Sequence, residues 1–196
     1  MSTGGTPLIA VQQIADLPDC VEVRLSSKPV NALSFALCTE LTETLRELEE
    51  DREVKGILLS SALDGIFTAG LDLRALLVTP DHPVDRVAEF WTAVQEMWLT
   101  LYMSPLATVS AISGHCPAGG CLLALSCDAR VMVQGSASIG LNEVQMGLVA
   151  PKWLSTLLKD TVGQRRAESM LQTGEVTAVV ARAHTNEISK HEAFLC

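Results

Sequence analysis

The sequence predicts an α/β fold with a largely parallel β-sheet. Short apolar runs, typical of buried strands, alternate with longer amphipathic segments, and glycine-bearing turns follow two of the apolar runs. This alternation is typical of strand–helix–strand units, in which right-handed crossovers place neighbouring strands parallel. The chain has 196 residues, of which 48% are hydrophobic and 19% charged, so it can bury one sizeable core and a single domain is expected.

The first fifty residues predict a β-hairpin followed by a helix that covers a sheet. Two extended runs, residues 8–12 and 21–25, flank Pro18-Asp19, and the second run alternates apolar and charged side chains. Leucines then recur every three or four residues, with acidic residues on the other faces: Leu33, Leu37, Leu41, Leu45 and Leu48. This spacing predicts an amphipathic helix.

Strands and helices continue to alternate along the rest of the chain. Apolar runs predict strands at residues 55–61, 107–113 and 129–133. Helical periodicity, or an apolar run after a glycine turn, predicts helices at residues 83–103, 118–126, 151–158 and 165–171. No low-complexity segment interrupts this alternation.

Composition argues against several classes of function. The net charge is −9, from 14 basic and 23 acidic residues, which argues against nucleic acid as a partner. No uncharged apolar run approaches the roughly 18 residues of a membrane-spanning helix, so no membrane span is predicted. The six cysteines form no CxxC pair, which favours reduced, mostly buried thiols over a disulfide framework, and no metal site is expected. His115 beside Cys116 is interpreted as incidental, because neighbouring side chains usually point apart.

Three short segments contain the candidate functional residues. The segment CPAGGC at residues 116–121 joins a predicted strand to a predicted helix, and GIFTAGLDL at residues 65–73 follows another strand. The first N–H groups of a helix lack internal partners, so two such turns can together hold an oxyanion, although each alone is compatible with an ordinary glycine turn. The third segment, IGLNE at residues 139–143, supplies one carboxylate, Glu143, whose apolar neighbours would raise its pKa.

Together these segments resemble the enoyl-CoA hydratase/isomerase (crotonase) superfamily, and most of all its mitochondrial 3,2-trans-enoyl-CoA isomerases. The resemblance runs from about residue 21 to residue 174, through TAGLD at 68–72, CPAGGC at 116–121 and GLNE at 140–143. It implies a crotonase-like core, a spiral of stacked ββα turns, over residues 1–174. It also implies an acyl-CoA thioester as substrate, no separate cofactor, a homotrimeric assembly and a location in the mitochondrial matrix.

The resemblance also implies roles for individual residues. The N–H groups of Leu71 and Gly119 correspond to the family's oxyanion hole, and Glu143 corresponds to its acid/base residue. The other implied substrate contacts are Thr68, Ala69, Gly70, Asp72 and Asn142. Because aspartate is favoured at helix starts, Asp72 is also a candidate N-cap.

Leu122 favours isomerisation over hydration. It lies three residues after Gly119 on the predicted helix, where hydratases of the superfamily carry a second glutamate. A leucine can neither orient nor deprotonate water, whereas one base and an oxyanion hole suffice to move a proton within a 3-enoyl-CoA. The expected reaction is conversion of 3-enoyl-CoA to 2-trans-enoyl-CoA in fatty acid β-oxidation. Trp91 and Trp98 on the helix predicted at 83–103 either pack in the core or line an acyl tunnel.

Residues 175–196 show no resemblance to the helices that close the pocket and build the trimer in the superfamily. We therefore expect a divergent, shortened C-terminal tail, a less stable chain and a doubtful trimer. The alternative to an active isomerase is a catalytically impaired variant that binds acyl-CoA or a family partner. No Arg-rich presequence is visible before Arg24, so the expected mitochondrial location depends on the resemblance alone.

Overall fold

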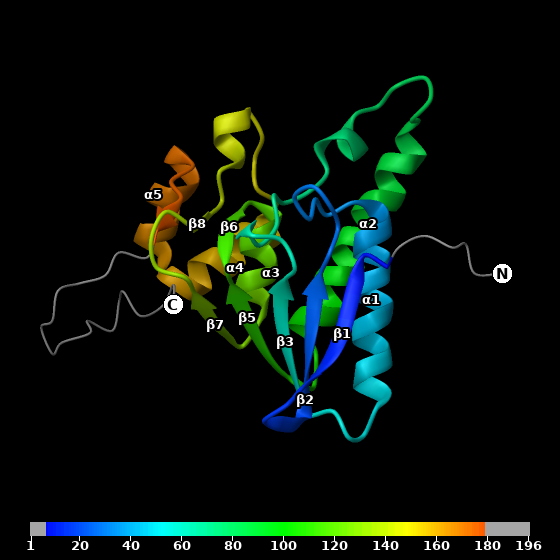
Figure 1. The fold of residues 1–196 in the computed structure, drawn as a ribbon. Helices are drawn as coiled ribbons and strands as arrows, with labels where there is room; N and C mark the ends of the chain where they lie inside the picture. The colour runs from blue at the N-terminus through cyan, green and yellow to red at the C-terminus, as the bar shows by residue number, and fades with distance from the viewer. Residues whose placement is uncertain (1–6, 179–196) are drawn as a thin grey trace, which may run out of the picture.

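The computed structural model describes residues 7–178 and contains two mainly parallel β-sheets flanked by helices (Figure 1). The larger sheet has the order β1-β2-β3-β5-β7 and comprises β1 (Ile9–Ile14), β2 (Leu17–Leu25), β3 (Gly56–Ser61), β5 (Ala107–Ile112) and β7 (Ala129–Met132). The smaller sheet has the order β4-β6-β8-β9 and comprises β4 (Gly65–Ile66), β6 (Gly114–Pro117), β8 (Ser138–Gly140) and β9 (Thr177–Ala178). The predicted α/β class is confirmed.

The larger sheet contains the predicted hairpin and the predicted parallel strands. β1 and β2 are antiparallel, with Ile9 opposite Leu25, whereas β2, β3, β5 and β7 run parallel to one another. Along β2 the side chains of Val21, Val23 and Leu25 are buried and those between them are half-buried. This period of two matches the alternation in the sequence.

The sequence does not predict the smaller sheet, because its strands span only two to four residues and are too short to show a period. The pairing of β4 with β6 requires glycine at position 114, since a Cβ there would lie 2.0 Å from the carbonyl carbon of Gly65. Each of β4, β6 and β8 leads into one of the three motif segments. The smaller sheet therefore brings these segments together.

The predicted helices are all present, and two single turns of 3-10 helix are additional. The α-helices are α1 (Phe35–Glu50), α2 (Val84–Tyr102), α3 (Gly119–Ser126), α4 (Lys152–Val162) and α5 (Gln164–Thr173). The 3-10 helices are η1 (Leu73–Leu76) and η2 (Glu143–Met146).

The local structure explains why the boundaries of α1 and α4 differ from the prediction. Helix α1 begins after Ser34, whose Oγ accepts a hydrogen bond from Leu37 N at 3.2 Å, so Leu33 precedes the helix although it belongs to the leucine series. Leu33 is fully buried and pairs with Leu71 in a short parallel bridge. Helix α4 continues past residue 158 to Val162 and ends at Gly163, whose φ of 83° is a backbone conformation that favours glycine.

The core lies around α3, which is buried along its whole length. α3 contacts α2, α4, β5 and β6, while α1 packs against α2 and lies beside β1 (Figure 1). A helix with apolar residues on every side has no solvent face, which explains why the sequence of α3 shows no amphipathic pattern. Within residues 7–178, no helix is both long enough and apolar enough to cross a membrane.

Candidate active site

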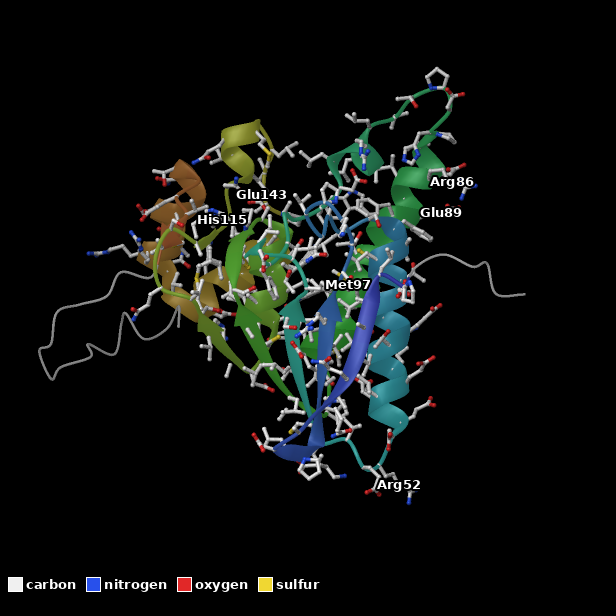
Figure 2. The ribbon with its side chains drawn as sticks, viewed as in Figure 1. Arg52, Arg86, Glu89, Met97, His115 and Glu143 are labelled. Carbon is white, nitrogen blue, oxygen red and sulfur yellow. The ribbon has the colours of Figure 1, made fainter. Side chains whose placement is uncertain are left out.

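The three motif segments meet at one cavity of about 360 Å³, a volume within the range of small-molecule sites. The first segment contributes Leu71 and Asp72, the second contributes Gly119, and the third contributes Asn142 and Glu143. Apolar side chains form much of the remaining wall, among them Leu76, Trp91, Val94, Leu122, Met146 and Leu154. In Figure 2, Glu143 lies at the opposite end of the molecule from Arg52, on the side toward which β3 and β5 point.

Backbone hydrogen bonds hold the first segment against the chain that precedes α1. Leu33 N donates to Gly70 O at 2.9 Å, and Asp72 N donates to Leu33 O at 3.1 Å. These two bonds lie on either side of Leu71. Because successive N–H groups of an extended segment point in opposite directions, the N–H of Leu71 points away from Leu33.

Asn31 fixes the loop that carries this segment. Its side chain accepts a hydrogen bond from Ser27 N at 2.7 Å and donates to Ser61 Oγ and Phe67 O, both at 2.9 Å. The backbone carbonyl oxygen of Asn31 accepts a hydrogen bond from Thr68 Oγ1 at 2.6 Å. Asn31 is fully buried in a left-handed conformation with φ 50°, which asparagine tolerates better than most residues. No sequence motif distinguished this residue.

The second segment turns sharply from β6 into α3 at Ala118. This residue has φ 49° and ψ −116°, a strained conformation for a residue with a side chain. Its own N–H donates to Gly140 O at 2.8 Å, which connects the second segment to the third. The turn places Gly119 at the first position of the helix, where the N–H has no partner within the helix.

The N–H groups of Leu71 and Gly119 lie side by side. A Cβ on Gly119 would lie 3.1 Å from Leu71 N, and a Cβ on Gly70 would lie 3.0 Å from Gly119 N. Across residues 7–178, neither N–H donates a hydrogen bond to another group of the protein. Two free donors at one cavity wall can bind a single oxygen that carries negative charge.

Glu143 is the first residue of η2 and is half-buried. Burial raises its pKa above the ordinary value of 4.5, and its Oε2 is buried without a hydrogen-bond partner among the described residues. Burial raises the pKa of the Cys121 thiol, and the Glu143 charge contributes to that increase, which indicates that the carboxylate lies near α3. The neighbouring Asn142 Oδ1 is likewise buried and without a partner in the described part of the chain.

Asp72 caps η1, and it also lines the cavity, where its contact with a substrate stays a prediction. Its Oδ1 accepts from Arg74 N at 3.1 Å, and its Oδ2 is 2.9 Å from Arg74 Nη2. The hydrogen bond from the Arg74 side chain lowers the pKa of Asp72. Asp72 therefore stays ionised and is unsuited to act as a proton-transfer group near neutral pH.

Some residues of the predicted set do not reach the cavity wall. Ala69 lines the cavity, but Thr68 and Gly70 are buried behind it, and Thr68 Oγ1 accepts a hydrogen bond from Gly70 N at 3.1 Å. Val144, which directly follows Glu143, is 43% exposed and does not line the cavity. Trp153 also lines the cavity, although no pattern in the sequence predicted this.

The cysteines and histidines within residues 7–178 form no further candidate site. The five cysteines within residues 7–178 are free thiols, and all but Cys20 are buried. Cys116 is inaccessible, and burial raises the pKa of its thiol, whereas His115 is exposed with its Nδ1 3.0 Å from Ser138 Oγ. Among the described residues, no group of three His, Cys, Asp or Glu side chains is placed to hold a metal ion.

Residues 19–183 match the sequence profile of the enoyl-CoA hydratase/isomerase family. The chain belongs to this family. Among its members, the chain is 47% identical over 154 residues to enoyl-CoA delta isomerase 1, mitochondrial, of Homo sapiens, covering 78% of this chain and 50% of the relative. It is 31% identical over 175 residues to enoyl-CoA hydratase domain-containing protein 2, mitochondrial, of Mus musculus, covering 88% of this chain and 58% of the relative.

Solved structures of the enoyl-CoA hydratase/isomerase family show the same fold. The crystal structure of human mitochondrial delta3-delta2-enoyl-CoA isomerase superposes with a TM-score of 0.83 at 42% identity, covering 88% of this chain and 66% of that chain. An enoyl-CoA hydratase from Bacillus anthracis gives a TM-score of 0.79 at 26% identity, covering 88% of this chain and 65% of that chain. The crotonase-like fold is therefore confirmed. The chain spans about half the length of the mitochondrial isomerases it matches.

Proposed function

We propose that this chain carries the core of an isomerase that converts 3-enoyl-CoA to 2-trans-enoyl-CoA. The observation that supports this reaction best is the composition of the cavity wall. Two free N–H donors face the same cavity as Glu143, whose pKa is raised, while the other carboxylate on the described wall, Asp72, is paired with Arg74. One base beside one oxyanion site is the minimum that a shift of a double bond next to a thioester requires.

In the proposed reaction, the thioester oxygen accepts hydrogen bonds from the N–H groups of Leu71 and Gly119. The Glu143 carboxylate removes a proton from C2, and the electrons of that C–H bond move toward the thioester oxygen to give an enolate. The two N–H groups stabilise the charge that develops there, because they are already oriented before the reaction begins. Asn142, next to Glu143 on the same wall, is a further proposed contact of the thioester region.

The reaction is completed by returning the same proton to the other end of the dienolate. Protonated Glu143 donates it to C4, the double bond settles between C2 and C3, and the carboxylate is regenerated. A raised pKa suits a group that must both accept and donate a proton near neutral pH. No separate cofactor takes part, since CoA belongs to the substrate.

Leu122 supports isomerisation over hydration. It is 1% exposed and lines the cavity from α3, where it presents only methyl and methylene groups. Hydration needs a polar group to orient the attacking water, and the leucine side chain at this position has none.

The relatives give the biological setting of the proposal. Those named enoyl-CoA delta isomerase 1 are mitochondrial, and we propose a mitochondrial role in fatty acid β-oxidation for this chain as well. We also propose that residues 1–174 form one crotonase-like core and residues 175–196 a divergent tail, the start of which adds β9 to the smaller sheet. The homotrimer of the superfamily stays an expectation for this chain.

Product analysis tests the proposed function. We expect the purified chain to convert 3-hexenoyl-CoA into 2-trans-hexenoyl-CoA, identified by chromatography against authentic standards. Accumulation of 3-hydroxyhexanoyl-CoA as the main product would favour a hydratase, and release of free CoA would favour a thioesterase. Binding of the substrate without any turnover would contradict the proposal and favour the catalytically impaired alternative.

A further inference from the structure

A second hollow lies beside the candidate active site and shares one residue with it. This hollow has a volume of about 460 Å³ and lies between α2 and α4. Trp153 lines both spaces, whereas the other residues of the second hollow do not reach the first: Trp98, Tyr102, Lys152, Thr156, Leu157 and Asp160. Trp153 therefore stands between the two spaces.

One face of α2 runs along both spaces. Trp91 and Val94 line the active-site cavity, and Trp98 and Tyr102 line the second hollow. These residues follow one another at spacings of three and four, so they share one face of the helix. Trp91 and Trp98 are about 10 Å apart along the helix axis, at about 1.5 Å per residue. The α2 wall is thus continuous past Trp153.

Helix α4 divides its residues between the two spaces in the same way. Leu154 faces the active-site cavity and Leu157 faces the second hollow, with Trp153 contributing to both. Lys152, Thr156 and Asp160 are exposed and repeat every four residues, so they give the second hollow a polar edge next to solvent.

Stacked rings hold the Trp153 side chain in place. The Trp153 and Trp98 ring centroids are 4.5 Å apart with an interplanar angle of 27°. Trp98 stacks in turn on Tyr102, with centroids 5.7 Å apart. Aromatic pairs at such distances stabilise each other beyond their burial, so the indole of Trp153 is a fixed part of the wall rather than a freely rotating side chain.

We propose that Trp153 limits the acyl chain length of the substrate by closing the active-site cavity toward the second hollow. This inference rests on the proposed function, because it assigns the occupant of the same cavity. The acyl chain of a long substrate would have to pass the indole to continue along the apolar face of α2. Removing the indole joins the two spaces into one apolar channel that ends at the polar edge of the second hollow.

The free energy of burying methylene groups sets the expected effect. Each methylene transferred from water to an apolar wall improves binding by about fourfold. In the parent chain this gain stops where the acyl chain meets Trp153. In a Trp153→Ala variant the gain continues with each further methylene that enters the second hollow.

The test compares chain-length profiles of the parent, Trp153→Ala and Trp153→Leu. We would measure kcat/KM for 3-hexenoyl-CoA, 3-decenoyl-CoA and 3-hexadecenoyl-CoA, and Kd for the corresponding saturated acyl-CoA esters. We expect Trp153→Ala to raise the ratio of hexadecenoyl to hexenoyl kcat/KM by about tenfold or more. Trp153→Leu should give a smaller increase, since leucine leaves part of the wall in place.

Ser155→Ala is the matched control, because Ser155 lies on the same helix but lines neither space. An unchanged chain-length profile in a Trp153 variant that unfolds cooperatively would overturn the inference, and Trp153→Leu decides the matter if Trp153→Ala does not fold. The Kd measurements require no turnover. A shifted binding profile in a chain without isomerase activity would therefore support the role of Trp153 while rejecting the proposed function.

Discussion

Glu143 differs from the other carboxylate of the cavity in what surrounds it. Asp72 is paired with Arg74 and its pKa is lowered, whereas burial raises the pKa of Glu143. The cavity therefore keeps one carboxylate charged near neutral pH and makes the other able to change its charge closer to neutral pH. As the pH rises, ionisation of Glu143 should therefore increase activity but decrease the stability of the fold.

Activity should be lost as the pH falls through the raised pKa of Glu143. The base must be ionised to remove the C2 proton, so the acid limb of kcat/KM should lie above the ordinary carboxyl pKa of 4.5. A pH profile of 3-hexenoyl-CoA isomerisation measures this limb. An acid limb at or below that value would show that Glu143 is not the titrating group.

Stability should show the reverse dependence on pH. Because the folded pKa is raised, the folded chain binds more protons than the unfolded chain between the two pKa values, and its stability falls as the pH rises through the folded pKa. We expect Glu143→Gln to resist urea better than the parent at neutral pH, with the difference vanishing below about pH 4. Equal urea midpoints for both proteins at neutral pH would contradict this reasoning.

Leu122 is the residue at which hydration should be gained. Its side chain lines the same cavity as the motif segments, so Leu122→Glu would place a second carboxylate beside the substrate. We expect a small but measurable hydration of 2-hexenoyl-CoA, with acyl-CoA binding retained. Leu122→Gln is the control, because it is equally polar but supplies no base. Loss of acyl-CoA binding without any hydration would show that Leu122 is purely structural.

At the scale of elements, the oxyanion site depends on a segment that carries no motif. Residues 27–33 form no long helix or strand, yet their backbone groups form hydrogen bonds with the residues immediately before and after Leu71. The larger strands and helices could be predicted because their apolar residues repeat over five or more positions. The smaller sheet and this supporting segment could not, because their structure depends on single contacts such as Gly114 against Gly65 and Asn31 against Phe67.

Asn31→Ala tests the importance of this support. The substitution leaves Ser27 N and Phe67 O without their partner and places alanine in a left-handed conformation. We expect the free energy of unfolding to fall by about 3 kcal/mol, and kcat to fall as Leu71 loses its fixed position. Denaturant titration and turnover measure the two effects. Asn31→Gly tolerates the left-handed conformation but removes the same side-chain hydrogen bonds, so parent-like stability in this variant would refute the hydrogen-bonding explanation.

At the scale of the whole molecule, the sequence predicted which residues share the active-site cavity. It predicted less well which contacts fix those residues in position. Leu71, Gly119, Asn142 and Glu143 come from three separate segments and share one cavity. That convergence was inferred from resemblance, since spacing alone cannot show that distant loops are neighbours. The role of Trp153 needed the structure, because the residue belongs to no motif. The predicted effects of the tail concern residues 175–196, most of which lie outside the described residues.

The most direct test of the account is the rate of 3-hexenoyl-CoA isomerisation by the Glu143→Gln variant. Glutamine preserves the shape of the side chain but cannot accept the C2 proton, so we expect the rate to fall by about 10²- to 10⁴-fold. Glu47→Gln, on the exposed face of α1, is the control and should match the parent. A Glu143→Gln variant that folds and retains a substantial fraction of the parent rate would contradict the central claim that Glu143 is the base.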